Sequence, residues 1–273
     1  MRTLGIVGTG LIGGSVALAC RERGIFDEFA GLDKDCSKLE IAIQLGVCDR
    51  PLTSGENLDA ICVSVPTGSI ASTIESLSTQ FSADVPIFDV GSVKGSILKE
   101  LHEVPENFVP SHPIAGSEKS GAHEARADLF NDSVCVITPS SGTNSRCVDR
   151  VKEIWEGIGA RVIELSPETH DVSLGLTSHL PHLLSYAIVE MLSEENEIAH
   201  GLVGTGFKDF SRIAEGDARV WSDILSANAG VLAEQTDQLI EKLLEIVRLA
   251  QTDKRALSKR IDLVRSFRQS LYD

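Results

Sequence analysis

The stretch Thr3-Leu-Gly-Ile-Val-Gly-Thr-Gly-Leu-Ile-Gly-Gly-Ser-Val-Ala-Leu18 decides the fold of this chain. It begins with a short apolar run, continues with glycines at the spacing Gly-x-Gly-x-x-Gly, and ends in an apolar helical pattern. This order predicts a strand, a tight turn and a helix. Gly8 allows the sharp turn, Gly10 lets a pyrophosphate approach the backbone, and Gly13 lets the helix pack closely on the strand. The stretch therefore predicts a dinucleotide-binding loop.

An acidic residue in the next predicted strand indicates which dinucleotide binds. The apolar run from Phe29 to Leu32 ends in Asp33, twenty residues after Gly13. A carboxylate at that place accepts hydrogen bonds from the adenosine ribose and repels a 2′-phosphate, so we expect NAD rather than NADP. An ordinary glycine-rich turn beside a surface aspartate is the alternative. The residues expected to contact the cofactor are Gly8, Gly10, Leu11, Ile12, Gly13, Asp33, Pro66 and Thr67.

Composition narrows the class of protein. The chain has 273 residues, of which 42% are hydrophobic, enough for one large domain or two modest ones. Its formal net charge of −15 argues against nucleic acid or an anionic membrane as partner. The six cysteines include no Cys-x-x-Cys pair, and neither a signal peptide nor a membrane-length apolar run is visible. We therefore expect a reduced, cytoplasmic protein.

The hydrophobic pattern divides the chain near residue 166. Before it, strands alternate with helices, which predicts an α/β domain with a doubly wound, mostly parallel sheet. After it, the apolar period changes from two to 3.6 and predicts an all-α region. We expect a Rossmann NAD-binding domain at 1–166 and a helical substrate and dimerisation domain at 167–273. The later predicted strands are 59–65, 85–90, 107–110, 134–138 and 161–165.

One predicted helix is long for a domain of this size. Asp217 is a plausible N-cap for a helix that continues to about Ala250, and a helix of about 30 residues spans roughly 50 Å. Such a helix is too long to pack only within a domain of about a hundred residues, which indicates a homodimer formed through helices. A last helix is expected after Asp253.

Three segments follow predicted strands and bring polar groups to the carboxyl edge of the sheet, where ligands bind. They are Pro66-Thr67, Asp89-x-x-Ser92-x-Lys94 and Ser111-His112-Pro113. His112 is the best candidate for chemistry, because it stands in a Gly-rich loop beside the rigid Pro113. A histidine that merely caps a strand end is the alternative. Capping of the following helix is the alternative for Ser92 and Lys94.

The helical region adds a second polar cluster. Ser178 and His182 are four residues apart and share a helix face, and Pro181 is expected to kink that helix. Zinc binding by His179 and His182 is the alternative, although no acidic or third ligand accompanies them. Farther on, Asp209 and Arg212 form either a surface pair or a site in which the arginine binds a carboxylate.

Together these motifs resemble the prephenate/arogenate dehydrogenase family of tyrosine biosynthesis. The resemblance runs from residue 4 to about residue 228, and the motifs beyond the glycine loop make it specific. The residues that carry it are Gly8-x-Gly10-x-x-Gly13-Gly14-Ser15, Asp89-Val-Gly-Ser92-Val-Lys94, His112-Pro-Ile-Ala-Gly116-Ser-Glu118-x-x-Gly121, Leu129-Phe130, Ser178-His179-Leu-Pro-His182, Gly206-Phe-x-Asp209-x-x-Arg212 and Trp221-x-Asp223-Ile224.

The resemblance implies NAD+-dependent oxidative decarboxylation of prephenate to 4-hydroxyphenylpyruvate. It also implies a role for each site residue: His112 is catalytic and Ser92 helps to bind the C4 hydroxyl. His182 and Arg212 hold the carboxylates, and the pocket is lined or braced by Ser178, Glu118 and Asp209.

Two other functions stay open. Arogenate is the alternative substrate, and Glu118 either binds its ammonium group or pairs with Lys119 or Arg126. A non-catalytic NAD-binding regulator would keep the glycine loop but has no need of His112, Ser92 and Arg212 together.

Overall fold

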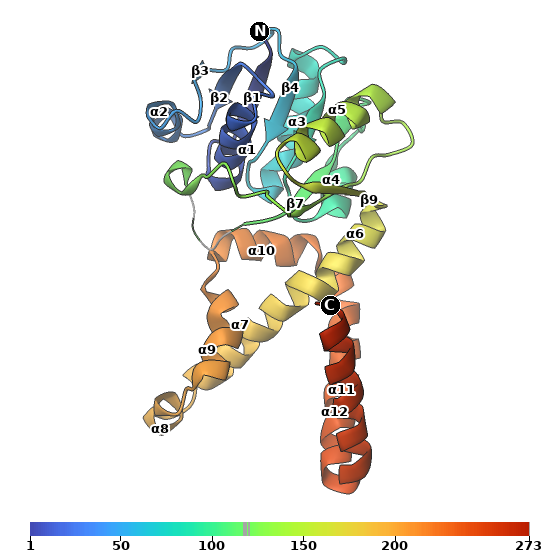
Figure 1. Cartoon of the computed structure of the whole chain (residues 1–273). Coiled ribbons are helices and arrows are strands. Elements are labelled where there is room, and N and C mark those ends of the chain that lie inside the picture. Colours follow the sequence, from blue (N-terminus) through green and yellow to red (C-terminus); the bar gives the residue numbers. More distant parts are fainter. Residues whose placement is uncertain (117–118, 120, 273) are drawn as a thin grey trace. The chain divides into compact units, whose positions relative to one another are not determined.

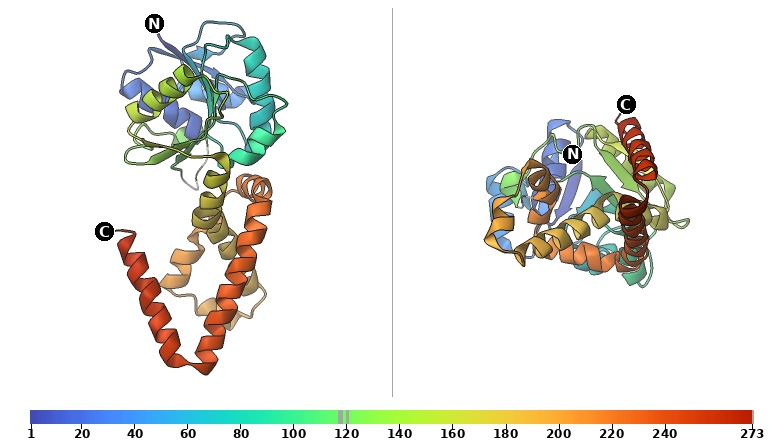
Figure 2. Two further views of the ribbon diagram at one scale, coloured as in Figure 1. Left: turned by 90° about the vertical axis from the view of Figure 1, so that its right-hand side faces the viewer. Right: turned by 90° about the horizontal axis from the view of Figure 1, so that it is seen from below.

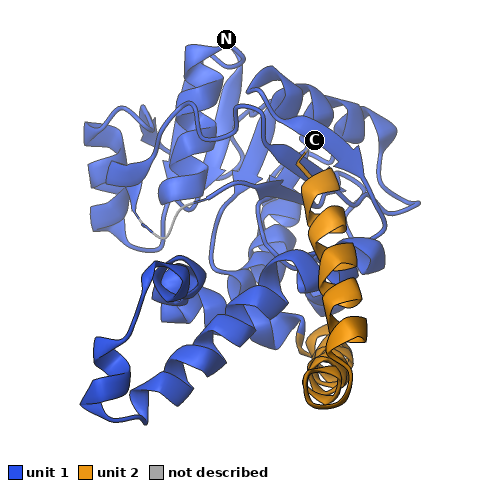
Figure 3. Cartoon of the chain, turned by 60° about the horizontal axis from the view of Figure 1, so that its bottom comes forward, with its two compact units in different colours: residues 1–228 blue, residues 229–273 orange. Residues whose placement is uncertain are grey.

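The computed structural model describes residues 1–116, 119 and 121–272. The chain forms two compact units, residues 1–228 and residues 229–273, which are coloured separately in Figure 3. The predicted domain boundary near residue 166 lies inside the first unit and remains a prediction. The two units are described here one at a time.

The first unit is built on the predicted parallel sheet. Its six strands lie in the order β3-β2-β1-β4-β5-β6, and every neighbouring pair is parallel. The strand order reverses between β1 and β4, which opens a crevice at their carboxyl ends. This confirms the predicted Rossmann domain (Figure 1). The strands are β1 (Thr3–Val7), β2 (Glu28–Leu32), β3 (Arg50–Pro51), β4 (Ala60–Val63), β5 (Ile87–Asp89) and β6 (Phe108–Val109).

Five helices accompany these strands, and two start with a side-chain cap. Asp35 accepts from the Ser37 N–H, and Asn144 accepts from the Arg146 N–H. Such caps satisfy N–H groups that have no partner inside the helix. The helices are α1 (Leu11–Glu22), α2 (Cys36–Gln44), α3 (Thr67–Gln80), α4 (Lys94–Glu100) and α5 (Ser145–Gly157).

The last three strands form a separate sheet, which differs from the single sheet expected. β7 (Ser111–Ile114) runs antiparallel to β8 (Val134–Ile137), and β8 runs parallel to β9 (Arg161–Glu164). Pro110 ends β6 because proline has no N–H to continue the ladder, and its carbonyl accepts from Thr138 instead. His112, expected in a loop, therefore lies in a strand opposite Val136.

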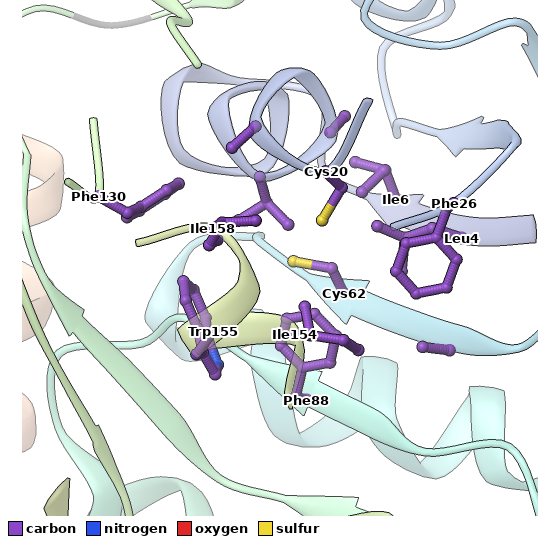
Figure 4. Packing of buried hydrophobic residues seen from close by; sticks show 14 of the residues in the cluster. Leu4, Ile6, Cys20, Phe26, Cys62, Phe88, Phe130, Ile154, Trp155 and Ile158 are labelled. Atoms are coloured by element: carbon purple, nitrogen blue, oxygen red, sulfur yellow. The ribbon is translucent and has the colours of Figure 1, made fainter. Parts of the chain in front are cut away.

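Alternating strand residues bury two cores, one on each face of the main sheet. Ile6 and Phe88 point into the larger cluster, which Figure 4 shows around Trp155. Trp155 is fully buried and meets Phe88 and Phe130 edge to face, with ring centroids 5.7 and 5.4 Å apart. The opposite face carries a smaller, mostly aliphatic cluster under α3. Burial on both faces explains why these strands read as continuous apolar runs.

The glycine loop has the geometry that its sequence indicates. Gly8 has a φ of +93°, and a Cβ there would lie 2.1 Å from the Ser64 carbonyl oxygen. A Cβ on Gly13 would lie 2.2 Å from the Gly8 oxygen, whereas one on Gly10 would meet no atom within 4 Å. The fold therefore requires Gly8 and Gly13, while Gly10 leaves open space beside the start of α1.

A long helical segment continues the first unit. It consists of α6 (Pro167–Leu174), one π-helical turn (Gly175–His179) and α7 (Leu180–Ser193), which follow one another without a break. In this segment Leu180 is buried, but Leu176 and Met191 are exposed. The unit ends with α8 (Glu197–Gly201), α9 (Thr205–Ser211), a 3-10 turn (Arg212–Glu215) and α10 (Ala218–Ala227).

The second unit is a hairpin of α11 (Ala229–Thr252) and α12 (Lys254–Ser270). Figure 2 shows its two helices diverging from the turn. Asp253 caps α12 as predicted, accepting from the N–H groups of Arg255 and Ala256. None of the described helices is long and apolar enough to span a membrane.

The predicted helix from Asp217 to Ala250 is wrong in one respect. Asp217 does cap its start, accepting from the N–H groups of Arg219 and Val220. However, α10 ends at Asn228, whose side-chain amide donates to the Asp171 carbonyl and to His179. These tertiary hydrogen bonds interrupt a segment that periodicity alone reads as continuous.

Replacing Gly13 by alanine should lower the melting temperature of the protein. The new Cβ would collide with backbone, and such overpacking costs about 1–3 kcal/mol. Gly68→Ala is the control, because its added Cβ meets no atom within 4 Å. Circular dichroism melts measure both variants. An unchanged melting temperature for Gly13→Ala would mean that α1 moves away from β1 without cost.

Candidate active site

A buried ion pair attaches the strand of His112 to the end of β5. The Asp89 carboxylate accepts from the N–H groups of Gly91 and Ser111, each at 2.9 Å, and from Lys94 Nζ. Lys94 Nζ also donates to the Ser111 carbonyl at 2.7 Å. Both charged side chains are 0% exposed. The Asp-x-x-Ser-x-Lys motif therefore holds β7 at the carboxyl edge, and Lys94 is part of this anchor.

A chain of hydrogen bonds runs from His112 into the protein. His112 Nδ1 lies 2.8 Å from His170 Nε2, and His170 Nδ1 lies 2.7 Å from Asp171 Oδ1. The Asp171 carboxylate also accepts from the backbone N–H groups of Lys94 at 2.9 Å and Gly95 at 2.8 Å. His170 is fully buried and Asp171 nearly so. Sequence reasoning missed this pair; its signal was only a histidine next to an aspartate in a polar segment of α6.

The surroundings keep His112 neutral and Asp171 ionised. Burial, with smaller contributions from His170, Lys94 and His179, holds the pKa of His112 well below its ordinary value. Burial alone would raise the pKa of Asp171. Hydrogen bonds from His170 and from two backbone N–H groups outweigh it and lower that pKa below its ordinary value. A neutral imidazole thus stands at the end of a chain that begins at a carboxylate.

His179 and His182 have separate hydrogen-bond partners. His179 Nδ1 accepts from Asn228 at 3.0 Å, and burial is the main reason that its pKa is lowered to about 4. His182 Nδ1 donates to the Ser178 carbonyl at 2.8 Å, and its ring stacks on Trp221 with centroids 3.5 Å apart. Within the described part of the chain, no group of three or more His, Cys, Asp or Glu residues has a geometry suited to a metal ion. The zinc interpretation gains no support from this arrangement.

The remaining helical candidates are Ser178, Asp209 and Arg212. Ser178 is half-buried in the π-helical turn, and π-turns are frequent at functional sites. Burial lowers the pKa of His182, and the nearby positive charge of Arg212 lowers it further. Asp209 and Arg212 are both exposed, and the structure gives no ion pair between them within its described residues. Arg212 is therefore close enough to influence the pKa of His182, and it does not form the alternative surface pair with Asp209.

The predicted cofactor residues surround the glycine loop and the end of β4. Asp33 accepts from the Thr9 N–H and Thr9 hydroxyl, each at 3.0 Å, so its carboxylate is fixed beside the loop. Gly10 precedes the first turn of α1. Pro66 and Thr67 start α3 immediately after β4. These positions meet at the carboxyl ends of β1, β2 and β4, and their contacts with a cofactor remain predictions.

Ser92 and Glu118 complete the predicted set of site residues. Ser92 is half-buried between β5 and α4, and no hydrogen bond joins it to His112. Glu118 lies outside the described residues. The two basic groups named as its alternative partners have other contacts, since Lys119 pairs with Glu124 at 3.0 Å and Arg126 with Asp128 at 3.5 Å.

Comparisons with known proteins cover nearly the whole chain. Residues 16–164 match a family model described as the nucleotide-binding domain of prephenate dehydrogenase, and residues 166–269 match its dimerization domain. The chain is 32% identical to a cyclohexadienyl dehydrogenase of Zymomonas mobilis, over 88% of this chain and 85% of that protein. It is 29% identical to a prephenate dehydrogenase of Bacillus subtilis, over 98% of this chain and 76% of that one.

A solved structure is similar in fold as well as sequence. The crystal structure of prephenate dehydrogenase from Aquifex aeolicus, in complex with hydroxyphenyl propionate and NAD+, is 31% identical to this chain. The likeness has a TM-score of 0.93 and covers 99% of this chain and 98% of that one.

Proposed function

The chain belongs to the prephenate dehydrogenase family, and we propose that it converts prephenate to 4-hydroxyphenylpyruvate with NAD+ as hydride acceptor. One observation above all supports this reaction. A neutral histidine, His112, is held at the carboxyl edge of a nucleotide-binding sheet, where a base is needed beside the hydride acceptor.

The glycine loop and Asp33 fit NAD+. The open space beside Gly10 admits a pyrophosphate, and the α1 N-terminus offers free N–H groups and a positive dipole end. The Asp33 carboxylate faces the loop, where it would accept from the ribose hydroxyls and repel a 2′-phosphate. Bound NAD+ supplies the hydride acceptor. The residues proposed to hold it are Gly8, Gly10, Leu11, Ile12, Gly13, Asp33, Pro66 and Thr67.

His112 and Ser92 act on the C4 hydroxyl of the substrate. As hydride leaves C4, His112 accepts the hydroxyl proton and stabilises the positive charge that develops on that carbon. When CO2 leaves C1, the ring aromatises, electrons flow to the C4 oxygen, and this oxygen takes the proton back. A dianion and NAD+ thus give a monoanion, NADH and CO2, with no net proton released. Ser92 contributes a second hydrogen bond to the hydroxyl.

Local positive charge has to bind a dianion in a protein whose net charge is −15. Arg212 is proposed to bind one carboxylate through two parallel hydrogen bonds. His182 is proposed to bind the other through Nε2, since its Nδ1 is already bonded to Ser178. Stacking on Trp221 holds that ring in place. The residues proposed to line or brace this pocket are Ser178, Asp209 and Glu118.

The second unit supports a homodimer. A helical hairpin alone buries little apolar surface, and several large apolar side chains on it remain exposed. The family model that matches this region is described as a dimerization domain. We propose that a second copy of the chain covers this face. The exposed apolar residues are Ile240, Leu243, Leu244, Ile246, Val247, Ile261, Leu263, Val264, Phe267 and Leu271.

Initial rates of NADH formation at 340 nm test the proposed reaction. Prephenate and arogenate are each assayed with NAD+ and with NADP+, and prephenate with NAD+ should give the highest kcat/KM. Higher kcat/KM with arogenate would assign the alternative substrate. Turnover of neither substrate, with NAD+ still bound in calorimetry, would favour the non-catalytic regulator.

His112→Asn and Arg212→Ala should separate catalysis from binding. His112→Asn should lower kcat by about 10²–10⁴-fold with little change in either KM, because the proton acceptor is lost.

Arg212→Ala should raise the substrate KM by about 10- to 150-fold, because a charge-assisted hydrogen bond to the substrate is lost. It should leave the KM for NAD+ unchanged. Steady-state kinetics with varied substrate and cofactor measure both effects.

The pH profile provides a further check on His112. Its pKa lies well below 6.5, so kcat/KM of the wild type should stay level above pH 6.5 and fall only at lower pH, as His112 takes up a proton. His112→Asn should lack this acid limb. More than a third of wild-type kcat in His112→Asn would remove this residue from the catalytic role.

Analytical ultracentrifugation tests the homodimer. The protein should sediment at about twice the chain mass of 29.3 kDa. Val264→Asp with Phe267→Asp should shift it to the monomer, because two charges would be buried in an apolar interface. Gln269→Asp, on the opposite face of α12, is the control and should remain dimeric. A wild-type protein that sediments as a monomer would contradict this proposal.

A further inference from the structure

We propose that His170 and Asp171 are positioning residues that place the His112 proton on Nδ1, so that Nε2 faces the substrate hydroxyl as an acceptor. The reaction in which this acceptor works rests on the proposed function. The position of the proton is a property of the protein without substrate, and it is therefore testable independently.

The argument starts at the buried carboxylate. Asp171 accepts from the backbone N–H groups of Lys94 and Gly95 and faces His170 Nδ1 at 2.7 Å. Backbone N–H groups only donate, so this environment selects the ionised, purely accepting form of Asp171. His170 Nδ1 must therefore carry a hydrogen to make its contact.

That hydrogen determines the next one along the chain. A neutral imidazole with its hydrogen on Nδ1 presents a lone pair on Nε2. When His170 is neutral its Nε2 can only accept, so the 2.8 Å contact with His112 Nδ1 is a hydrogen bond only if His112 Nδ1 is the donor. Neutral His112 then has its lone pair on Nε2, the atom that has no partner among the described residues. The chain thus selects one tautomer of a histidine that would otherwise sample two.

The same contacts orient the ring. His112 and His170 meet edge to face, with centroids 5.1 Å apart and planes at 68°. The His112 backbone is held between β8 and the Asp89–Lys94 anchor. Ring and backbone are therefore both constrained, and little rotational entropy is lost when substrate binds.

The proton balance of the reaction explains why this base can be buried. His112 takes a proton from the C4 oxygen and returns it to that oxygen in the same turnover, so it needs no route to solvent. The charge that it carries meanwhile is stabilised through His170 by Asp171. In serine proteases a buried aspartate likewise orients a catalytic histidine, and the change to asparagine, which gives the wrong tautomer, lowers kcat by about 10⁴-fold.

A purely structural role is the competing explanation, because Asp171 also satisfies the N-terminus of α4. If the role were purely structural, substitutions of His170 or Asp171 would lower the stability of the protein and leave kcat per folded molecule unchanged. Leu174, a buried apolar residue of the same helix, provides the matched control. Leu174→Ala should lower the melting temperature and leave kcat within about twofold of wild type, since it removes packing without touching the hydrogen-bond chain.

His170→Phe and His170→Gln test the link in the middle of the chain. Phenylalanine removes the acceptor for His112 Nδ1 and should lower kcat by about 10²–10³-fold, with both KM values within threefold of wild type. Glutamine can place its carbonyl oxygen near the former position of Nε2, so kcat of His170→Gln should be at least tenfold higher than kcat of His170→Phe. Wild-type kcat in His170→Phe, or no recovery in His170→Gln, would overturn the proposal.

The tautomer itself can be observed in the complete protein without substrate. Nitrogen-15 NMR of histidine-labelled protein, with the His112 signals assigned by means of His112→Asn, should show the His112 hydrogen on Nδ1 in the wild type. In His170→Phe it should show a mixture of the two neutral tautomers, with the hydrogen on Nδ1 in some molecules and on Nε2 in others. A wild-type hydrogen on Nε2 overturns the proposal, even if the enzyme oxidises prephenate. Conversely, a protein with the His112 hydrogen on Nδ1 that oxidises neither prephenate nor arogenate would retain the positioning chain. In that case the proposed function would be rejected. Because the wild-type spectrum decides, a His170 variant that fails to fold does not prevent the test.

Discussion

The buried ion pair between Asp89 and Lys94 is the interaction on which the candidate site depends. Isolated charges are costly to bury, and this pair is tolerated because nearly every polar atom in it has a partner. Asp89 accepts from Gly91, Ser111 and Lys94, and Lys94 also donates to the Ser111 carbonyl. The pair thus joins β5, the start of α4 and β7, three elements that meet only at this edge of the sheet. The backbone of His112 is positioned as a consequence.

Lys94 connects two separate constraints on His112. Its Nζ holds the strand of His112 through Ser111, and its backbone N–H binds Asp171, which through His170 contacts the His112 ring. The backbone and the imidazole ring of His112 are therefore both positioned by contacts that lead to Lys94. The ammonium group also helps to keep the pKa of His112 low, so one cation contributes both position and protonation state.

The charge distribution suits a dianionic substrate despite the acidic chain. The Lys94 charge is already compensated by Asp89, so it cannot hold a substrate carboxylate as well. Arg212 has no ion-pair partner within the described residues, and its charge lowers the pKa of His182, whose ring is fixed by Ser178 and Trp221. This separation leaves the Arg212 charge available for the carboxylate binding proposed above, while Lys94 serves the scaffold.

Local sequence determined the features that depend on neighbouring residues. Glycine spacing predicted the loop, because Gly8 has a positive φ and a Cβ on Gly13 would collide with the nearby Gly8 carbonyl oxygen. Asp217 and Asp253 predicted helix starts, because a cap involves residues only two or three positions away. Tertiary structure alone decided three other features. They are the separate sheet of β7, β8 and β9, the break at Asn228 and the chain from His112 to Asp171. Each rests on hydrogen bonds between residues far apart in the sequence, and Asn228 and Asp171 are 57 residues apart. Periodicity carries no information about such pairs, so a polar residue in α6 became part of the site only when the fold brought α6 against α4 and β7.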